Sequence, residues 1–276
     1  MLHQSVVSTP QICAGCPVLS CGICGQVSAA GLRRLEGFAR RITYGAEQEI
    51  WSAESPEPFV ALLCSGHLRM AQYSVNGRRQ VMAILNPGDM AGEIQSPRAG
   101  YALETVTPVT ICRIERSAFQ RLLTEDAELR RATYRQRIRR LDAVRRLIWS
   151  LGVQTLEERL AGFLALACKT QPFQPLPDGG GILSIQIPRG DIADHLNTSR
   201  ESISRVTYRL QAAGLIEIRD ATHFRIPDLD RLRRAGGVAA ATEPTRRRGI
   251  SLPRRARLIS VLGVPGLGAG PALPAC

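Results

Sequence analysis

The sequence has no hydrophobic run long enough to cross a membrane, and it has almost no lysine. Its longest apolar stretch covers residues 160–168, about half of the roughly 20 residues that a transmembrane helix needs. Residues 1–10 show no basic region followed by an apolar core, so no secretory signal is visible. Lys169 is the only lysine among 36 basic residues, a bias that by itself indicates no particular chemistry. We therefore expect a cytoplasmic protein with no membrane partner.

The sequence also lacks the residue patterns of an active site. We find no phosphate-binding glycine loop, no pair of carboxylates at catalytic spacing and no nucleophile with a neighbouring base. A C-x2-C pair occurs at Cys13 and Cys16, but a thiol-disulfide enzyme places that motif beside a βαβ unit, and none is visible around it. We expect a protein that is not an enzyme.

The composition is that of a folded, basic protein. Hydrophobic residues make up 44% and charged residues 22% of the 276 residues, and the formal net charge is +12 at pH 7. Residues 242–276 hold six arginines and one glutamate, so this tail contributes +5 and the rest of the chain +7. A basic chain favours a polyanionic partner, and double-stranded DNA is the first candidate.

Four of the eight cysteines lie close together near the start, at Cys13, Cys16, Cys21 and Cys24. In a reducing compartment such a group indicates metal or redox chemistry rather than disulfides. Thiolates are soft ligands, so the two C-x2-C pairs suit either zinc or an iron–sulfur cluster. A zinc site of this kind usually has roughly a dozen or more residues between its pairs, whereas only four separate Cys16 from Cys21.

The other four cysteines have ordinary interpretations. Cys64 and Cys168 follow apolar stretches and are expected to be small, buried core residues. Cys276 is the last residue, and we expect it to have no role. Cys112, taken alone, would also be a core residue, on the last strand of the predicted sheet domain.

Turn signals and hydrophobic periodicity divide the chain into five regions. They are a cysteine-rich arm (residues 1–27), short strands that imply an antiparallel barrel or sandwich (28–123), a long helix and hinge (124–168), a C-terminal module (169–235) and a basic tail that we expect to be disordered (236–276). Asn76-Gly77, between two strand-like runs, predicts a two-residue type I′ hairpin. Residues 171–181 are rich in Pro and Gly and predict a loop or linker.

Residues 125–167 show a helical pattern with a narrow apolar stripe. Its members repeat at intervals of three and four, as in a coiled-coil seam: Leu141, Val144, Ile148 and Leu151. Residues 130–146 contain eight arginines and a single acid, Asp142. The pattern favours a homodimer seam over a charged helix flank packed on its own domain, because so narrow a stripe needs a partner helix.

The C-terminal module has the pattern of a helix-turn-helix. Residues 191–196 predict a short helix, and Asn197 follows where the turn often needs a left-handed residue. Ser199 can cap a second helix by accepting a hydrogen bond near Ser202. The inward face of that second helix is expected to hold Ile203, Val206 and Leu210.

The outward face of the second helix carries side chains suited to DNA. Gly214 ends this helix, and residues 215–219 and 223–226 predict a hairpin wing. Arg205 can bond a guanine bidentately, and Glu201 can accept from a cytosine amino group. The outward residues gather at the N-terminal end, which is the part of a recognition helix that meets base edges: Arg200, Glu201, Ser204 and Arg205.

The residues from Ile187 to Arg205, with Leu210 and the segment 214–216, resemble the helix-turn-helix of the CRP/FNR superfamily of bacterial transcription regulators. The segment 201–205 is similar to the Glu-x-x-Ser-Arg motif of its FNR-type, oxygen-sensing branch. The similarity covers residues 10–235 and leaves the basic tail without a counterpart. It implies an α+β fold with an N-terminal antiparallel β-roll or jelly-roll sensory domain, a long dimerisation helix and a C-terminal winged helix-turn-helix.

The same resemblance implies partners and a cofactor. Glu201, Ser204 and Arg205 would read a TTGAT-type half-site, a homodimer would read the palindrome, and RNA polymerase would be a partner of this activator. FNR-type sensors hold an oxygen-labile [4Fe-4S] cluster with three N-terminal cysteines and a fourth from the barrel. By that pattern the ligands are Cys13, Cys16, Cys24 and Cys112, with Cys21 in reserve for Cys24. Family members have five or seven residues between the second and the third ligand, and seven residues separate Cys16 from Cys24.

In the mechanism that the resemblance implies, the cluster ties the arm to the barrel and favours the dimer, and oxygen reverses this. Two alternatives stay open, namely a zinc-stapled DNA-binding protein without a redox role and a regulator of the CRP type that responds to a cyclic nucleotide. For the latter, Gly92-Glu93-Ile94 is present. However, Arg98 is followed by Ala99 instead of Ser or Thr, so the phosphate site looks incomplete and a cyclic nucleotide is the less favoured cofactor.

Overall fold

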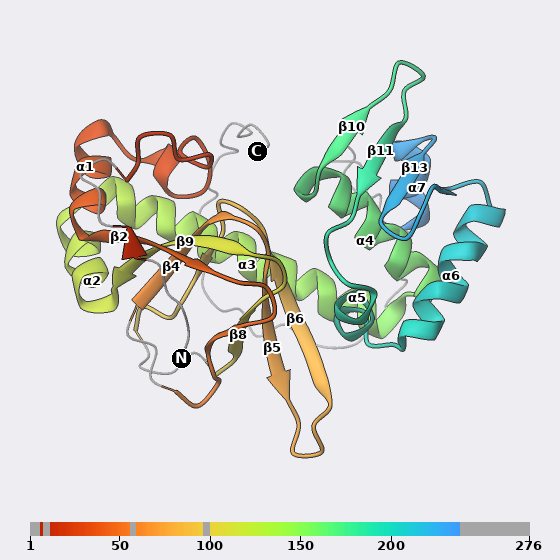
Figure 1. The fold of residues 1–276 in the computed structure, drawn as a ribbon, viewed down its shortest axis with the longest axis horizontal. Coiled ribbons are helices and arrows are strands. Elements are labelled where there is room, and N and C mark those ends of the chain that lie inside the picture. The colour runs from red at the N-terminus through yellow and green to blue at the C-terminus, as the bar shows by residue number, and fades with distance from the viewer. Residues whose placement is uncertain (1–5, 8–11, 56–58, 96–99, 238–276) are drawn as a thin grey trace, which may run out of the picture.

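A long helix, α3 (Ala127–Val153), runs from the β-sheets of the N-terminal half toward the short helices of the C-terminal half (Figure 1). The structure is a computed structural model, and it describes residues 6–7, 12–55, 59–95 and 100–237. The basic tail therefore lies outside the described residues. Every helix in the described ranges is too short or too polar to span a bilayer.

The N-terminal half contains two antiparallel sheets. In chain order the strands are β1 (Val6–Val7), β2 (Ala39–Tyr44), β3 (Glu49–Trp51), β4 (Phe59–Ser65), β5 (Leu68–Tyr73), β6 (Arg79–Leu85), β7 (Met90–Ala91), β8 (Ala102–Thr105) and β9 (Val109–Glu115). One sheet has the order β1-β2-β9-β4-β7 and the other β3-β8-β5-β6. Between them lies a core in which Leu63, Leu103 and Ile111 are almost completely buried. The antiparallel sheet domain expected from the sequence is confirmed.

The outer face of the first sheet is covered by helices and by the cysteine-rich arm. These helices are a 3-10 turn η1 (Cys24–Gln26), α1 (Ala29–Phe38) and α2 (Arg116–Glu125). Strand β9 is therefore buried on both sides: Ile111 faces the core between the sheets, whereas Cys112 and Ile114 face the arm and the helices. The region expected to hold strands thus begins and ends with a helix.

The turn after β5 differs from the prediction. Strands β5 and β6 are joined by residues 74–78, because Tyr73 pairs with Arg79, and the expected two-residue type I′ turn is wrong. The Ser74 oxygen accepts from the Gly77 N–H at 2.9 Å, and Gly77 alone has a positive φ, of 73°. One left-handed glycine is enough for this longer loop, so Asn76 does not need that conformation.

The helical pattern of residues 125–167 is interrupted once, and α3 and α4 (Leu156–Thr170) are separate helices. Gln154 and Thr155 are extended between them. The Thr155 hydroxyl accepts from the Glu158 N–H at 3.3 Å, and the Glu158 carboxylate accepts from the Thr155 N–H at 2.8 Å. This capping box starts a new helix and ends the periodic pattern.

Replacing Thr155 by alanine is expected to lower the free energy of unfolding by about 1 kcal/mol, because the N-terminus of α4 loses an acceptor. Urea denaturation followed by circular dichroism measures the change. Serine keeps the hydroxyl, so Thr155→Ser serves as the control. An equal loss in both variants would contradict the capping role.

The C-terminal half is a winged helix-turn-helix. Its elements are β10 (Phe173–Pro175), β11 (Gly181–Ser184), α5 (Arg189–His195), α6 (Arg200–Ala212), β12 (Glu217–Ile218), β13 (His223–Ile226) and α7 (Leu229–Ala235). The sheet order is β10-β11-β13-β12. The predicted wing is confirmed as β12 and β13. The predicted linker of residues 171–181 is wrong at its ends, because they pair as a hairpin in which Phe173 faces Leu183.

Candidate metal centre and nucleic-acid interface

Five free thiols from distant parts of the chain come together at the outer face of the first sheet. Cys13, Cys16 and Cys24 lie on the arm, Cys64 on β4 and Cys112 on β9. Cys64 and Cys112 belong to one hydrophobic cluster, Cys16 and Cys24 pack against it, and Cys13 is near enough to raise the pKa of Cys112. The structure thus brings Cys112 to the arm cysteines, as the resemblance implied.

The arm is held in place by buried apolar residues and by hydrogen bonds to the sheet domain. Ile23 is 2% exposed, and Ile12 and Val18 are also buried. The Cys13 N–H donates to a carboxylate oxygen of Glu36 on α1 at 2.9 Å. These contacts are made by short turns around the cysteines, for which residues 12–24 offer no periodic signal.

Cys112 is positioned by the strand register. It lies on the central strand β9, directly opposite Arg41 of β2 on one side and Leu62 of β4 on the other. Opposite residues of an antiparallel pair point to the same face. The face that Cys112 shares with Arg41 and Leu62 is the one covered by the arm.

The thiols influence one another electrostatically. Burial raises the pKa of Cys112, and the neighbouring thiols of Cys64, Cys24, Cys13 and Cys16 raise it further. Burial also raises the pKa of Cys24 to about 12, again with contributions from Cys13 and Cys16. At neutral pH these groups are therefore protonated, and a metal that binds them must displace their protons.

Cys64 is a member of this site that the sequence did not reveal. It is buried, as expected of a core residue. Its thiol donates to the Leu62 carbonyl at 3.7 Å. However, burial followed by the charge of Cys16 raises its pKa to about 12, so Cys64 lies beside the arm thiols. The signal in the sequence is its spacing of two from Leu62, because strand residues two apart share a face. That Leu62 lies opposite Cys112 follows only from the register.

The remaining cysteines have other settings. Cys21 is disulfide-bonded and so does not belong to the free thiols. Cys168 is buried in the core of the C-terminal half, as predicted. Cys276 lies outside the described residues. Within the described ranges, no three His, Cys, Asp or Glu side chains are grouped closely enough to hold a single metal ion.

Arg41 brings a positive charge to the thiols. One of its terminal nitrogens donates to the Ile12 carbonyl at 2.5 Å, which fixes the guanidinium beneath the arm. Its charge acts to lower the pKa values of Cys13 and Cys64, although burial outweighs it. Its Nε is buried and has no hydrogen-bond partner among the described residues. The site therefore presents thiols together with a cation that is not fully satisfied.

The Gly92-Glu93 turn is occupied by a side chain of α3. Arg137 donates to the Gly92 carbonyl and, at 3.3 Å, to the Glu93 carboxylate. This contact joins α3 to the sheet domain and accounts for the arginine one turn before Leu141, where an apolar residue would have extended the stripe. Arg98 and Ala99, which bear on the cyclic-nucleotide alternative, lie outside the described residues.

The apolar stripe of α3 is only partly covered by the chain itself. Leu141 is 43% and Ile148 66% exposed, and Val144 and Leu151 are half-buried. A regular row of large apolar side chains that stays open to water indicates a partner surface.

The recognition helix has the local geometry expected from the sequence. Asn197 is left-handed, with φ of 51°. The Ser199 hydroxyl accepts from the Ser202 N–H at 3.2 Å and caps α6. The inward residues are buried as predicted: Ile203, Val206 and Leu210.

The side chains proposed to contact bases lie together at the N-terminal end of α6. Arg200, Glu201 and Arg205 are exposed, and Ser204 is half-buried. The Ser204 hydroxyl donates to the Arg200 carbonyl at 3.2 Å, and an Arg205 nitrogen donates to the Ser202 hydroxyl at 2.9 Å. Two guanidinium groups and one carboxylate are thus available to a groove, which is the donor and acceptor set that base edges need.

Comparison with known proteins agrees with this architecture. Residues 41–126 match the family described as cyclic nucleotide-binding domain, and residues 158–235 match the Crp-like helix-turn-helix domain. These domains in this order define a DNA-binding transcription regulator. The chain belongs to the CRP/FNR family.

Its relatives are transcription regulators and not enzymes. The chain is 29% identical over 226 residues to a probable transcriptional activator of Rhizobium leguminosarum bv. viciae (82% of this chain, 93% of the relative). It is 26% identical over 228 residues to the transcriptional activator protein FnrL of Cereibacter sphaeroides (82% and 92%). In fold it is similar to FixK2 from Bradyrhizobium japonicum, with 24% identity and a TM-score of 0.66 over 73% of this chain and 99% of that one.

Proposed function

We propose that this protein is a homodimeric transcription activator that senses oxygen through a [4Fe-4S] cluster and binds a palindromic TTGAT-type operator. The observation that carries the proposal is the meeting of Cys112, on the central strand β9, with the thiols of the arm. The proposed ligands are Cys13, Cys16, Cys24 and Cys112. A bound cluster of this type supplies sensitivity to oxygen.

The chemistry of the residues fits such a group. Four free thiols converge from two parts of the chain, and iron–sulfur clusters take four cysteine thiolates. A cluster with four thiolates is an anion, and Arg41 offers a nearby positive charge with a buried Nε–H that has no acceptor among the described residues. Cys24 is favoured over Cys21 because its thiol is free and lies beside the others.

The arm also contacts the helix that carries the apolar stripe. The Ser28 N–H, just after the arm, donates to the Glu128 carboxylate at 2.7 Å, and Arg135 donates to the Gln26 side chain at 3.4 Å. Both contacts fall on the first half of α3, upstream of Leu141. The placement of the arm can therefore influence how α3 presents its stripe to a second copy.

Operator binding would follow from the exposed end of α6. A dimer places two recognition helices in successive major grooves, about 34–36 Å apart. Arg205 would then contact a guanine, Glu201 would accept from a cytosine amino group, and Ser204 would reach a base or a phosphate. RNA polymerase is proposed as the partner of the bound activator.

The proposal is tested by purifying the full chain without oxygen and measuring its iron, sulfide, zinc and visible spectrum. We expect about four iron per chain and broad absorbance at about 400 nm that bleaches in air. Cys112→Ser is expected to lose most of the iron. Cys168→Ser removes a buried thiol from the other half of the molecule and is the matched control.

Three results would contradict the proposal. Full iron content in Cys112→Ser would exclude that ligand set. Zinc without colour would support the zinc-stapled alternative. A metal-free dimer that binds DNA only with cyclic AMP would support the cyclic-nucleotide alternative.

Arg41→Gln is expected to weaken retention of the cluster about tenfold, because groups around a metal site typically contribute 10- to 100-fold to its affinity. The rate of bleaching under limited oxygen and the residual iron measure the effect. Arg41→Lys keeps the positive charge and is expected to retain the cluster much better than Arg41→Gln. Arg40→Gln is the control, since Arg40 is exposed next to it on the same strand. Equal behaviour of Arg40→Gln and Arg41→Gln would rule out a specific role.

A further inference from the structure

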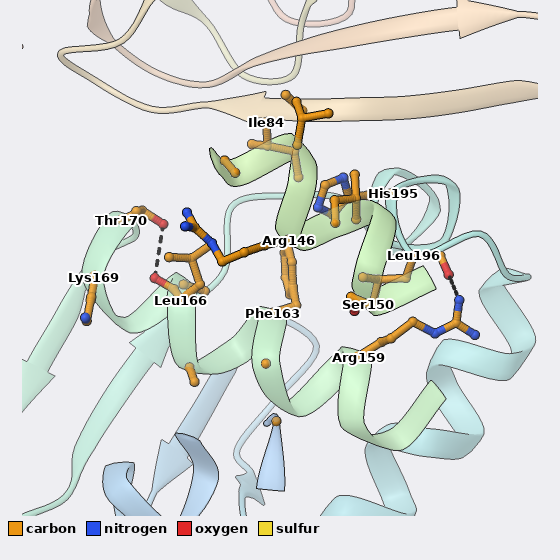
Figure 2. Close-up of a pocket in the computed structure, with 18 of the residues that line it drawn as sticks. Ile84, Arg146, Ser150, Arg159, Phe163, Leu166, Lys169, Thr170, His195 and Leu196 are labelled. Carbon is orange, nitrogen blue, oxygen red and sulfur yellow. Dashed lines mark hydrogen bonds between the residues drawn. The ribbon is translucent and has the colours of Figure 1, made fainter. Parts of the chain in front are cut away.

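An apolar cavity of about 660 Å³ lies where the two halves of the molecule meet (Figure 2). Its lining comes from β6, α3, α4, the ends of α5 and α7, and neighbouring loop residues. The walls are mostly large apolar side chains: Ile84, Val144, Leu147, Phe163 and Leu166. Small-molecule sites in proteins typically have volumes of about 300–1,000 Å³ and apolar walls with a few polar groups.

The charged side chains that line this cavity are all positive. Among the described residues, the lining includes five cations and no acid: Arg140, Arg146, Arg159, Lys169 and Arg233. Arg140 and Arg233 have acidic partners outside the cavity, Asp89 at 3.5 Å and Asp230 at 2.8 Å. No described acid forms an ion pair with Arg146 or Lys169. The cavity therefore has an excess of positive charge that the acids of the described ranges do not neutralise.

Arg146 reaches over the apolar walls. Figure 2 shows its guanidinium extending from α3 toward Leu166 and Thr170 at the end of α4, with Phe163 projecting from the middle of α4. At the other end, the ring of His195 lies 6.1 Å from that of Phe163. Arg159 donates to the Leu196 carbonyl at 2.7 Å there, while its buried Nε has no partner among the described residues.

We propose that this cavity binds a small amphipathic anion, with its anionic head at Arg146 and its apolar body along Phe163, Val144 and Leu147. The proposal does not depend on the iron–sulfur cluster. An apolar body explains the walls, and a single carboxylate or similar head explains why the lining has cations without acids. A neutral apolar molecule would leave that charge without a counterpart.

Two other occupants fit less well. Gly237 lines the cavity and the chain continues from there, but residues 242–276 carry a charge of +5, which the cations would repel. A second copy would lie along the stripe of Leu141, Val144, Ile148 and Leu151. Val144 belongs to both the stripe and the cavity wall. The other α3 residues Arg140, Ala143, Leu147 and Ser150 line the cavity and are displaced from the stripe by one position, about 100° around the helix.

Binding can be followed with Trp149, which lines the cavity. The chain has two tryptophans, so Trp51→Phe in the sheet core leaves Trp149 as the reporter. We titrate this variant of the full chain with decanoate below its micellar concentration. A saturable change in fluorescence is expected, with affinity at least tenfold higher than for decan-1-ol or decyltrimethylammonium.

Arg146→Gln in the same background is expected to weaken decanoate binding about tenfold or more, because it removes a charge-assisted hydrogen bond. Arg145→Gln is the matched control, since Arg145 pairs with Asp142 and does not line the cavity. Circular dichroism and binding to a fixed DNA duplex show that both variants are folded.

The proposal is overturned if Arg146→Gln binds decanoate as well as the Arg145→Gln control does. It is also overturned if the alcohol binds as tightly as the carboxylate. Finally, a chain that ends at Gly237 and binds decanoate while the full chain does not would show that the tail fills the cavity. None of these readouts involves iron, so they are independent of the proposed sensor function.

Discussion

Replacing Asp191 by alanine is expected to lower the free energy of unfolding by about 3 kcal/mol, because it breaks a buried ion-pair network between the two halves. Asp191, on α5, is 2% exposed. Its carboxylate accepts from Arg69 of β5 at 2.8 Å and from Arg79 of β6 at 2.5 Å. Arg69 is also buried, and although burial lowers its pKa, the carboxylates of Glu47, Glu104 and Asp191 hold the pKa above its ordinary value.

Alanine at this position leaves two guanidinium groups with less compensating charge. In the variant, Arg69 still pairs with Glu104 at 2.6 Å and Arg79 with Asp194 at 2.7 Å. The loss of stability is therefore expected at the lower end of the range of about 3–5 kcal/mol for breaking a buried ion pair. Asp191→Asn keeps the shape and removes the charge, and we expect it to cost nearly as much as alanine. This result would separate the electrostatic contribution from the packing contribution.

Urea denaturation followed by circular dichroism and by tryptophan fluorescence measures the Asp191 effect on both halves. Asp230→Ala is the control, because Asp230 forms an ion pair with Arg233 on the surface of α7. Exposed pairs contribute little, so this variant is expected to unfold almost like the parent. If Asp191→Ala were no less stable than Asp230→Ala, the network would not hold the halves together.

Replacing Arg205 by alanine is expected to weaken operator binding by about 10- to 100-fold, the effect of losing a bidentate contact to guanine, worth about 1–3 kcal/mol. The exposed guanidinium lies in the second turn of α6 and donates to the Ser202 hydroxyl at 2.9 Å. Arg205→Lys keeps the positive charge but not the fork of donors. It is therefore expected to recover nonspecific affinity more than sequence discrimination.

The measurement is a titration of a TTGAT-type palindrome and of a shuffled duplex at several salt concentrations. Arg209→Ala is the matched control, because Arg209 is exposed further along α6 and pairs with Glu157. Loss of a phosphate contact weakens binding to all sequences alike, and it reduces by about one the slope of log affinity against log salt concentration. An equal loss on both duplexes for Arg205→Ala would mean that Arg205 contacts phosphate and not bases.

The DNA-binding module could be predicted from the sequence because its geometry is set locally. Asn197 is where the backbone is left-handed, Ser199 is where an N-terminus needs an acceptor, and Gly214 is where the chain leaves α6 with φ of 65°. Each demand restricts the residue type at one position. The break before α4 also has a local signal, the capping-box spacing of Thr155 and Glu158, but the prediction of one helical pattern over residues 125–167 did not use it.

The thiol site could be predicted only in part, since its geometry is set by contacts between distant segments. The four cysteines of the proposed ligand set lie near one another on the outer face of the first sheet. Cys64 and Arg41 join them because β4 and β2 flank β9 in a particular register. Hydrophobic alternation indicates which face a strand residue takes, whereas the register between strands follows from the whole fold.

The junction between α3 and α4 determines how the two halves can move. The Gln154 N–H still donates to Ser150 at 3.0 Å, and Thr155 caps the next helix, so each helix end is satisfied on its own. Rotation about these two residues therefore breaks no helical hydrogen bond. Reorientation of the DNA-binding half then amounts to a rigid swing that breaks the ion pairs of Asp191 with Arg69 and Arg79 but leaves the helices intact. Such domain motions typically take microseconds to milliseconds. A conformational change in the sheet domain can therefore alter the placement of the DNA-binding half on that timescale without unwinding a helix.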